Sequence, residues 1–213
     1  MYGLDNLDEK IYQRLQRLDV KSNFFIEAGA NDGLTQSNTA MLEFNYGWKG
    51  ILVEPNFENY QKAQVNRPNS KVYRGALVSR DYPNETINGI FSTDSITRWN
   101  GLCSGVTKDH LAYAPQWISE VPAITLDQVL TDCNAPNQIG LLSLDVEDYE
   151  LEVMRGLDTE VWRPHVIVME VAKHYDKEIL ESHINYMKSI DYFPDDDFDL
   201  TAHDFIFIDS RKR

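Results

Sequence analysis

The sequence predicts an α/β fold in which helices cover both faces of a mostly parallel sheet. Segments that resemble strands alternate along the chain with segments of helical period, the order that builds such a sheet. The apolar runs of the strands do not alternate with polar residues, as expected for strands buried on both faces. Several runs also end in an acid, and ligands in such sheets bind at the carboxyl ends of the strands. The acids are Glu27, Glu54, Asp145 and Glu170.

The first half of the chain predicts three strand and helix pairs in order. Residues 4–18 repeat Leu and Ile at helical spacing, so they predict an amphipathic helix in an N-terminal extension, residues 1–22. Short apolar runs then predict strands, and longer amphipathic runs predict the helices between them. Gly47 and Pro68 are the predicted helix stops. The strands are expected within 24–28, 50–56, 71–79 and, more weakly, 85–93, and the helices within 35–46 and 57–67.

The second half continues this order after an interruption. Residues 95–120 contain aromatic residues without a clear period, and we expect an irregular insert that caps an acceptor. Residues 121–130 predict a short extended piece and a short helix. The remaining strands are expected within 139–147, 165–171 and 203–209, and the remaining helices within 149–157 and 177–190.

Composition limits the classes of function. The chain has 213 residues with 42% hydrophobic content, enough for one domain, residues 1–213. A net charge of −14 argues against binding nucleic acid or an anionic membrane, because both need a basic surface. The sequence has no apolar run long enough to span a membrane, and its start is polar rather than signal-like. Two widely spaced cysteines, Cys103 and Cys133, predict reduced thiols in a cytoplasmic protein.

The stretch NFFIEAGANDG, residues 23–33, follows the first predicted strand. Its glycines, Gly29 and Gly33, are four residues apart and do not match the G-x-G-x-x-G spacing of dinucleotide-binding turns. Asp32 would also lie where a phosphate needs neutral or positive surroundings. Acids at strand ends suit S-adenosylmethionine, which has a sulfonium and an ammonium but no phosphate. Glu54, at the end of the second strand, can accept hydrogen bonds from two ribose hydroxyls.

Four segments together resemble the FkbM-type family of S-adenosylmethionine-dependent methyltransferases. They are FIEAGANDG, GILVEPN, ITLDQVL and LLSLDVEDYELEVMRGL, and the resemblance covers roughly residues 23–209. It implies a Rossmann-like class I methyltransferase fold with a seven-stranded sheet. It also implies methyl transfer from S-adenosylmethionine to a hydroxyl of a sugar, glycan or natural product.

The resemblance also implies roles for particular residues. The residues of the cofactor turn would be Glu27, Ala28, Gly29, Asn31 and Gly33, with Asp32 beside them. Those around the ribose and adenine would be Glu54, Pro55, Asn56, Ala76 and Leu77. Those beside the methyl group would be Asp145, Val146 and Glu147. The family usually has Asp-Val-Glu-Gly at the last site, whereas this chain has Asp148 in place of the glycine. That exchange is expected to alter the acceptor pocket.

A hydroxyl acceptor benefits from a general base, and Asp145 is the first candidate, followed by Glu147 and Glu170. No metal is expected, although oxygen ligands from Asp145, Glu170 and Asp148 would suit Mg²⁺. Two other functions stay open at this point. One is an NAD(P)-dependent oxidoreductase on a related sheet, and the other is a non-catalytic ligand-binding or interaction module.

Overall fold

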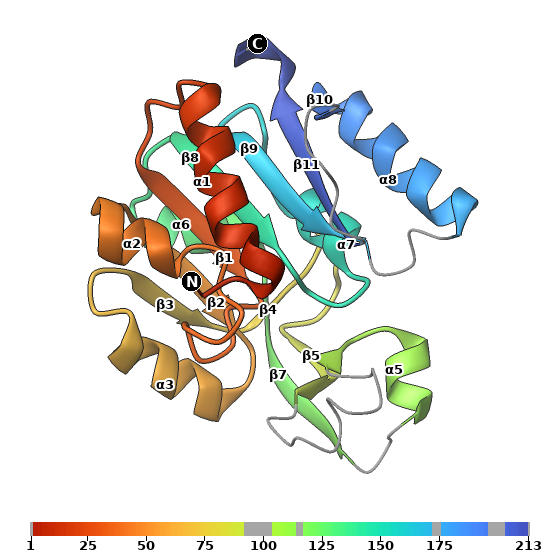
Figure 1. Cartoon of the computed structure of the whole chain (residues 1–213). Helices are drawn as coiled ribbons and strands as arrows, with labels where there is room; N and C mark the ends of the chain where they lie inside the picture. Colours follow the sequence, from red (N-terminus) through yellow and green to blue (C-terminus); the bar gives the residue numbers. More distant parts are fainter. Residues whose placement is uncertain (1, 92–103, 114–116, 172–175, 196–202, 213) are drawn as a thin grey trace.

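The computed structural model describes residues 2–91, 104–113, 117–171, 176–195 and 203–212, and its centre is a seven-stranded sheet (Figure 1). The strands lie in the order β10-β11-β9-β8-β1-β2-β3. β3, β2, β1, β8 and β9 are parallel, whereas β11 runs antiparallel to both β9 and β10. The predicted mostly parallel sheet is therefore confirmed. The bounds are β1 Phe24–Ala28, β2 Lys49–Glu54, β3 Lys71–Arg74, β8 Gln138–Leu144, β9 Arg163–Glu170, β10 Tyr192–Pro194 and β11 Asp204–Asp209.

Helices cover both faces of this sheet because successive strand residues point to opposite sides. Phe25 of β1 packs with α1, α2 and α3, whereas its neighbour Ile26 packs with α6, α7 and α8. Both residues are fully buried. The helix bounds are α1 Leu7–Arg17, α2 Ala40–Tyr46, α3 Phe57–Asn66, α6 Leu126–Asp132, α7 Glu150–Arg155 and α8 Lys177–Ser189.

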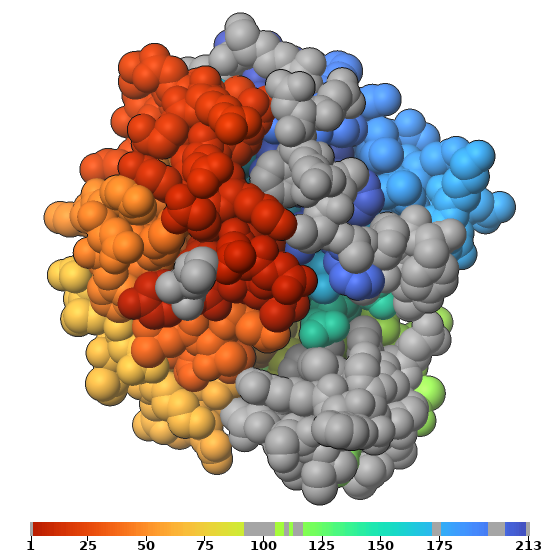
Figure 2. Space-filling model, viewed as in Figure 1, coloured from red at the N-terminus to blue at the C-terminus, as the bar shows by residue number. Residues whose placement is uncertain are grey.

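The predicted N-terminal helix is α1, which follows a short 3₁₀ turn at Leu4–Asn6. Leu7, Ile11 and Leu15 form one apolar stripe and are buried against the sheet. Figure 1 shows α1 lying across the strands, and Figure 2 shows the residues of α1 and α2 forming a continuous surface on this side. The N-terminal segment thus completes one helical layer of the fold.

A second, smaller sheet lies beside the first, with strand order β4-β7-β5-β6 (Figure 1). The sequence predicts one strand within 71–79, but the structure divides it at Gly75. β3 stays in the large sheet, and β4 pairs with β7 of the small one. A Cβ at Gly75 would lie 2.8 Å from Ile124 Cδ1, so the missing side chain permits this crossing. The bounds are β4 Ala76–Leu77, β5 Thr86–Phe91, β6 Ser104–Gly105, β7 Ile118–Ile124 and α5 Lys108–Tyr113.

Residues 95–120 are more regular than the sequence suggests, as far as the structure describes them. Their described parts contain β6, α5 and the first residues of β7. Trp99, which interrupts the sequence pattern, lies outside the described residues, and Trp117 is exposed. Among the described helices, none is long and apolar enough to cross a membrane.

Candidate functional site

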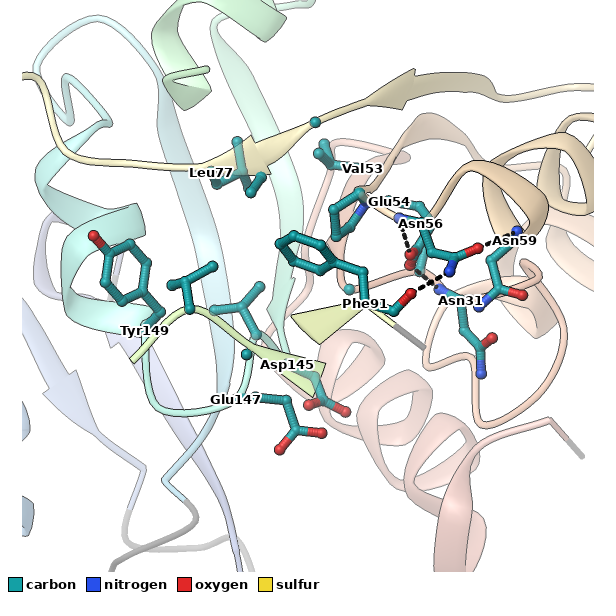
Figure 3. Close-up of a pocket in the computed structure, with 18 of the residues that line it drawn as sticks. Asn31, Val53, Glu54, Asn56, Asn59, Leu77, Phe91, Asp145, Glu147 and Tyr149 are labelled. Atoms are coloured by element: carbon teal, nitrogen blue, oxygen red, sulfur yellow. Dashed lines mark hydrogen bonds between the residues drawn. The ribbon is translucent and has the colours of Figure 1, made fainter. Parts of the chain in front are cut away.

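A cavity of about 420 Å³ lies at the carboxyl ends of the central strands (Figure 3). Its walls come from the turns after β1, β2 and β8, from β4, and from the ends of β5 and β6. These turns follow parallel neighbours in the sheet, so the topology brings together residues that are far apart in sequence. The predicted residues that line it are Gly29, Asn31, Glu54, Pro55, Asn56, Ala76, Leu77, Asp145, Val146 and Glu147.

Gly29 is required where β1 ends, because the backbone there approaches the turn after β8. Its φ is +80°, in the left-handed region. A Cβ at this position would lie 1.8 Å from the backbone oxygen of Asp145. Any other residue would push the two turns apart and change the floor of the cavity.

Glu54 forms the next wall, and its carboxylate holds two turns together. Oε2 accepts a hydrogen bond from the backbone N–H of Asn31 at 2.8 Å, and Oε1 accepts one from Asn56 at 2.8 Å (Figure 3). Glu54 is only 6% exposed, and burial raises its pKa to about 7 despite these two hydrogen bonds. A carboxylate oxygen has more than one lone pair, so both oxygens can still accept hydrogen bonds from a ligand.

Glu27 has a different environment, although the sequence places it at a strand end like Glu54. It does not line the cavity. Its carboxylate accepts hydrogen bonds from the hydroxyls of Ser37 and Thr39, at 2.9 and 2.6 Å, and from the backbone N–H of Asn38 at 2.8 Å. Arg67 lies 3.3 Å away and is fully buried.

Arg67 is the centre of this buried network. Its Nε donates to Glu43 at 2.8 Å, and Nη1 donates to the carbonyl of Gly33 at 3.0 Å and to Ser37 at 3.1 Å. Nη2 donates to the hydroxyl of Thr39 at 2.9 Å. The network therefore fixes residues 33–39, part of the segment that lines the cavity. It also explains why α2 begins at Ala40 rather than at residue 35, as the sequence predicts, because residues 37–39 bind Glu27 instead.

Three other predicted residues also lie outside the cavity lining. Ala28 is buried in the core of the large sheet. Gly33 has a φ of +83° and packs against Arg67 and Ala63. Asp32 stabilises its own turn by accepting hydrogen bonds from the N–H groups of Leu34 and Thr35. These residues shape the turn rather than face its ligand side.

The turn after β8 supplies the acids on the opposite side of the cavity. Asp145 is accessible to water from the cavity, but protein surrounds it elsewhere, and this burial raises its pKa. Glu170 ends the neighbouring strand, does not line the cavity, and hydrogen-bonds to Asp145. Burial, and then the charge of Asp145, raise the pKa of Glu170 strongly, so this pair of carboxyl groups holds a proton at neutral pH. Burial and the charges of Asp145 and Asp148 raise the pKa of Glu147 to about 8.

Asp148 occupies the position where the resembled family usually has glycine. Its φ is +68°, and that of Glu147 is +57°. The left-handed conformation explains a glycine here, and Asp is one of the few other residues that adopt it readily. Asp148 is half-buried but does not line the cavity. Among the described residues, no group of three or more His, Cys, Asp or Glu could hold a metal, and this includes Asp145, Glu170 and Asp148.

Several lining residues were not expected from the sequence. Tyr149 directly follows the acids of the β8 turn, so its position was within reach of sequence reasoning. Phe91, Gly105 and Val106 come from the small sheet, whose position no local pattern indicates. The full unexpected set is Ala30, Thr35, Gln36, Ser37, Val53, Asn59, Gly75, Phe91, Gly105, Val106 and Tyr149.

Comparison with solved structures finds methyltransferases of low sequence identity. A TehB-like S-adenosylmethionine-dependent methyltransferase from Corynebacterium glutamicum is 11% identical, with a TM-score of 0.48 over 97% of this chain and 90% of that one. A precorrin-6y C5,15-methyltransferase from Geobacter metallireducens is also 11% identical, with a TM-score of 0.48 over 96% and 90%. A methyltransferase from Pyrococcus furiosus is 16% identical, with a TM-score of 0.44 over 97% and 85%. All three TM-scores lie below 0.5.

The family comparison is decisive. No curated protein matches the chain. The model of the methyltransferase FkbM domain, however, matches residues 27–194, from the end of β1 to the end of β10. That match includes the turns after β1, β2 and β8, which supply both the Glu54 side and the Asp145 side of the cavity. Because it spans well over half of the chain, the protein belongs to the FkbM family of S-adenosylmethionine-dependent methyltransferases.

Proposed function

We propose that the protein methylates a hydroxyl group of a sugar, glycan or small natural product, with S-adenosylmethionine bound in the cavity described above. The acidic residues of the described cavity lining, without basic residues among them, support this most directly. Its lining includes the carboxyl groups of Glu54, Asp145 and Glu147, and the described lining residues include no Lys, Arg or His. Such a lining favours a ligand with positive charge and hydroxyl groups over one with phosphates.

The residues present fit the proposed cofactor. A volume of about 420 Å³ lies within the roughly 300–1,000 Å³ typical of small-ligand sites. Glu54 would accept hydrogen bonds from the ribose hydroxyls, and Gly29 keeps the turns after β1 and β8 together in the floor of the site. When bound, S-adenosylmethionine would supply the methyl group from its sulfonium, and cleavage of the sulfur–methyl bond would leave S-adenosylhomocysteine as the neutral leaving group.

Asp145 is the proposed general base. It faces the cavity, whereas its hydrogen-bond partner Glu170 does not line the cavity, so Asp145 is the member of the pair that an acceptor can reach. As the hydroxyl oxygen of the acceptor forms its bond to the methyl carbon, Asp145 would accept the hydroxyl proton. Glu147, with a pKa of about 8, is mostly protonated at neutral pH and would hydrogen-bond to the acceptor. A base at this position fits a hydroxyl acceptor, whose proton must leave as the bond to the methyl carbon forms.

Thermal unfolding with separate additions of S-adenosylhomocysteine, S-adenosylmethionine, NAD and NADP tests the cofactor. A ligand at 100 times its Kd should raise the Tm by roughly 5–11 °C. We expect this shift with S-adenosylhomocysteine and S-adenosylmethionine, and not with NAD or NADP. A shift with NAD or NADP alone would instead indicate an oxidoreductase.

Transfer of a labelled methyl group to panels of polyols, glycosides and matched amines tests the acceptor. Asp145→Asn should retain binding of S-adenosylhomocysteine but lower kcat by about 100-fold or more, the usual contribution of a general base. Transfer to amines only, or full activity of Asp145→Asn, would contradict the proposed reaction. Asp127→Asn is the control, because Asp127 lies on α6 away from the cavity lining.

A further inference from the structure

One aromatic side chain in the cavity comes from the small sheet. Phe91 ends β5 and lines the cavity together with Gly105 and Val106 of the β6 region. It is half-buried and packs at the edge of the apolar cluster that contains Ala76. Figure 3 shows its ring pointing into the cavity, between Glu54 and Asn56 on one side and Tyr149 on the other.

The position of the Phe91 backbone is tied to the turn after β2. The Asn56 side chain donates a hydrogen bond from Nδ2 to the carbonyl oxygen of Phe91 (Figure 3). The same residue donates its backbone N–H to Glu54, and its Oδ1 accepts a hydrogen bond from the N–H of Asn59 at 3.0 Å, which caps α3. Phe91 therefore lies two hydrogen bonds away from the carboxylate that is proposed to bind the ribose.

The orientation of the ring depends on a missing side chain. Gly89 precedes Phe91 by two residues, so both face the same side of β5. A Cβ at Gly89 would lie 2.2 Å from Cζ and 2.5 Å from Cε2 of the Phe91 ring. The tip of the ring thus lies against Gly89, and an alanine there would displace it. Strand alternation and the glycine together present the ring as a platform.

The chemistry of the surrounding wall indicates what this platform binds. Beside Glu54 the wall combines the apolar residues Val53, Pro55 and Leu77 with the amide side chains of Asn31, Asn56 and Asn59. The opposite part of the cavity contains Asp145 and Glu147 and suits polar or charged groups. A nucleoside whose ribose is held by Glu54 has one flat apolar part, its base, and a planar base gains from stacking on an aromatic ring.

We propose that Phe91 stacks on the adenine ring of the cofactor, held by Asn56 and oriented by Gly89. The small sheet thereby forms one wall of the cofactor site. This inference rests on the proposed binding of S-adenosylmethionine in the cavity. It makes Phe91 a binding residue and makes Asn56 and Gly89 positioning residues.

Calorimetric titration with S-adenosylhomocysteine and with 5′-methylthioadenosine tests the proposal. The second ligand keeps the adenine and ribose but lacks the amino-acid part. Phe91→Ala should weaken both ligands by the same factor, about 5- to 150-fold, the range found for loss of a base-stacking aromatic residue. Phe91→Trp should restore most of the affinity. Phe91→Leu keeps apolar bulk without an aromatic face and should restore little. Phe57→Ala removes an exposed aromatic residue outside the cavity and should leave both affinities unchanged.

Gly89→Ala provides an independent test, because residue 89 does not line the cavity. We expect it to weaken both ligands, and the double variant with Phe91→Ala should bind within about twofold of Phe91→Ala alone, since the two changes remove the same contact. If wild-type protein binds both ligands and Phe91→Ala binds them equally well, the stacking proposal is overturned while the proposed function stands. If Phe91→Ala affects only the KM for the acceptor, the ring belongs to the acceptor site and the proposal is likewise overturned. If wild-type protein binds neither ligand, the proposed function fails and the stacking proposal fails with it.

Discussion

At the scale of single residues, Glu54 both shapes the turns around it and faces the cavity. Its two oxygens each accept one backbone hydrogen bond, from Asn31 and Asn56. Burial raises its pKa to about 7, so the Glu54 carboxyl group is only partly ionised at neutral pH when no ligand is bound. Ribose hydroxyls donate hydrogen bonds, and these are stronger to a carboxylate than to a neutral acid. Ligand binding should therefore favour the ionised form.

This gives a pH prediction for Glu54. At pH 6 roughly one tenth of the carboxyl groups would be ionised, so S-adenosylhomocysteine should bind about tenfold more weakly at pH 6 than at pH 8. Glu54→Gln should bind more weakly at pH 8, by about 1–3 kcal/mol, and should lose most of the pH dependence. Titration calorimetry at pH 6, 7 and 8 measures both effects, with exposed Glu58→Gln as the control. Equal affinity of wild type and Glu54→Gln at pH 8 would remove Glu54 from the ribose site.

Residue patterns predicted the position of Glu54 but not the environment of Glu27. Both are acids at the ends of neighbouring parallel strands, and the local sequence is similar. They differ because Arg67, forty residues along the chain from Glu27, lies beside Glu27. This contact makes Glu27 part of a buried hydrogen-bond network. A contact between residues so far apart leaves no periodic signal in either segment.

At the scale of elements, the Arg67 network connects the end of α3 to the segment between β1 and α2. Removing one member of a buried ionic network leaves the other charges without a partner. Arg67→Ala should therefore lower the free energy of unfolding by about 3–5 kcal/mol and weaken S-adenosylhomocysteine binding, because part of that segment lines the cavity. Arg80→Ala breaks a more exposed ion pair with Asp127 and should change stability by about 1 kcal/mol or less. Urea unfolding of both variants makes the comparison, and a loss below about 1 kcal/mol for Arg67→Ala would show that the network does not stabilise the fold.

Strands and helices with long apolar runs could be predicted from the sequence. The division of one run between two sheets, and the short strand β10, could not. Periodicity identifies 71–79 as one apolar run, yet its first part pairs with β2 and its last part with β7, on either side of Gly75. β10 contains three residues and ends in Pro194, so it has neither the length nor the pattern of a strand. It forms at the sheet edge, where proline is tolerated, because β11 provides the partner backbone.

At the scale of the whole molecule, several acids are held in surroundings that favour their neutral form. Burial raises the pKa of Glu147 and Glu150 to about 8, and that of Glu54 to about 7. Unfolding returns them to an ordinary value near 4.5, so the native state binds more protons than the unfolded state between about pH 5 and 8. The contribution of these groups to the free energy of unfolding is fully present at low pH and is lost as pH rises through their native pKa values.

The free energy of unfolding should accordingly fall between pH 5 and pH 8. Each fully buried group contributes a slope of up to about 1.4 kcal/mol per pH unit within its titration range. Glu150→Gln should flatten the profile, because Glu150 is 1% exposed and its Oε2 has no hydrogen-bond partner among the described residues. Glu152→Gln, on the same helix but partly exposed, should leave the slope unchanged. Urea unfolding at four pH values gives the profile, and constant or rising stability over this range would contradict it.

The pairing of β4 with β7 has a consequence for how this enzyme can change over evolution. Ala76 lies opposite Ala123, and Leu77 lies opposite Ile124. The segment between β4 and the end of β7 therefore begins and ends at neighbouring points. Everything between these two pairs is an excursion whose ends are already joined by a ladder of backbone hydrogen bonds. Such a segment can be lengthened, shortened or exchanged between relatives without altering the path of the large sheet. Grafting residues 78–122 from one family member onto another would therefore transfer the small-sheet wall of the cavity as a unit, while Glu54 and Asp145 stay where they are.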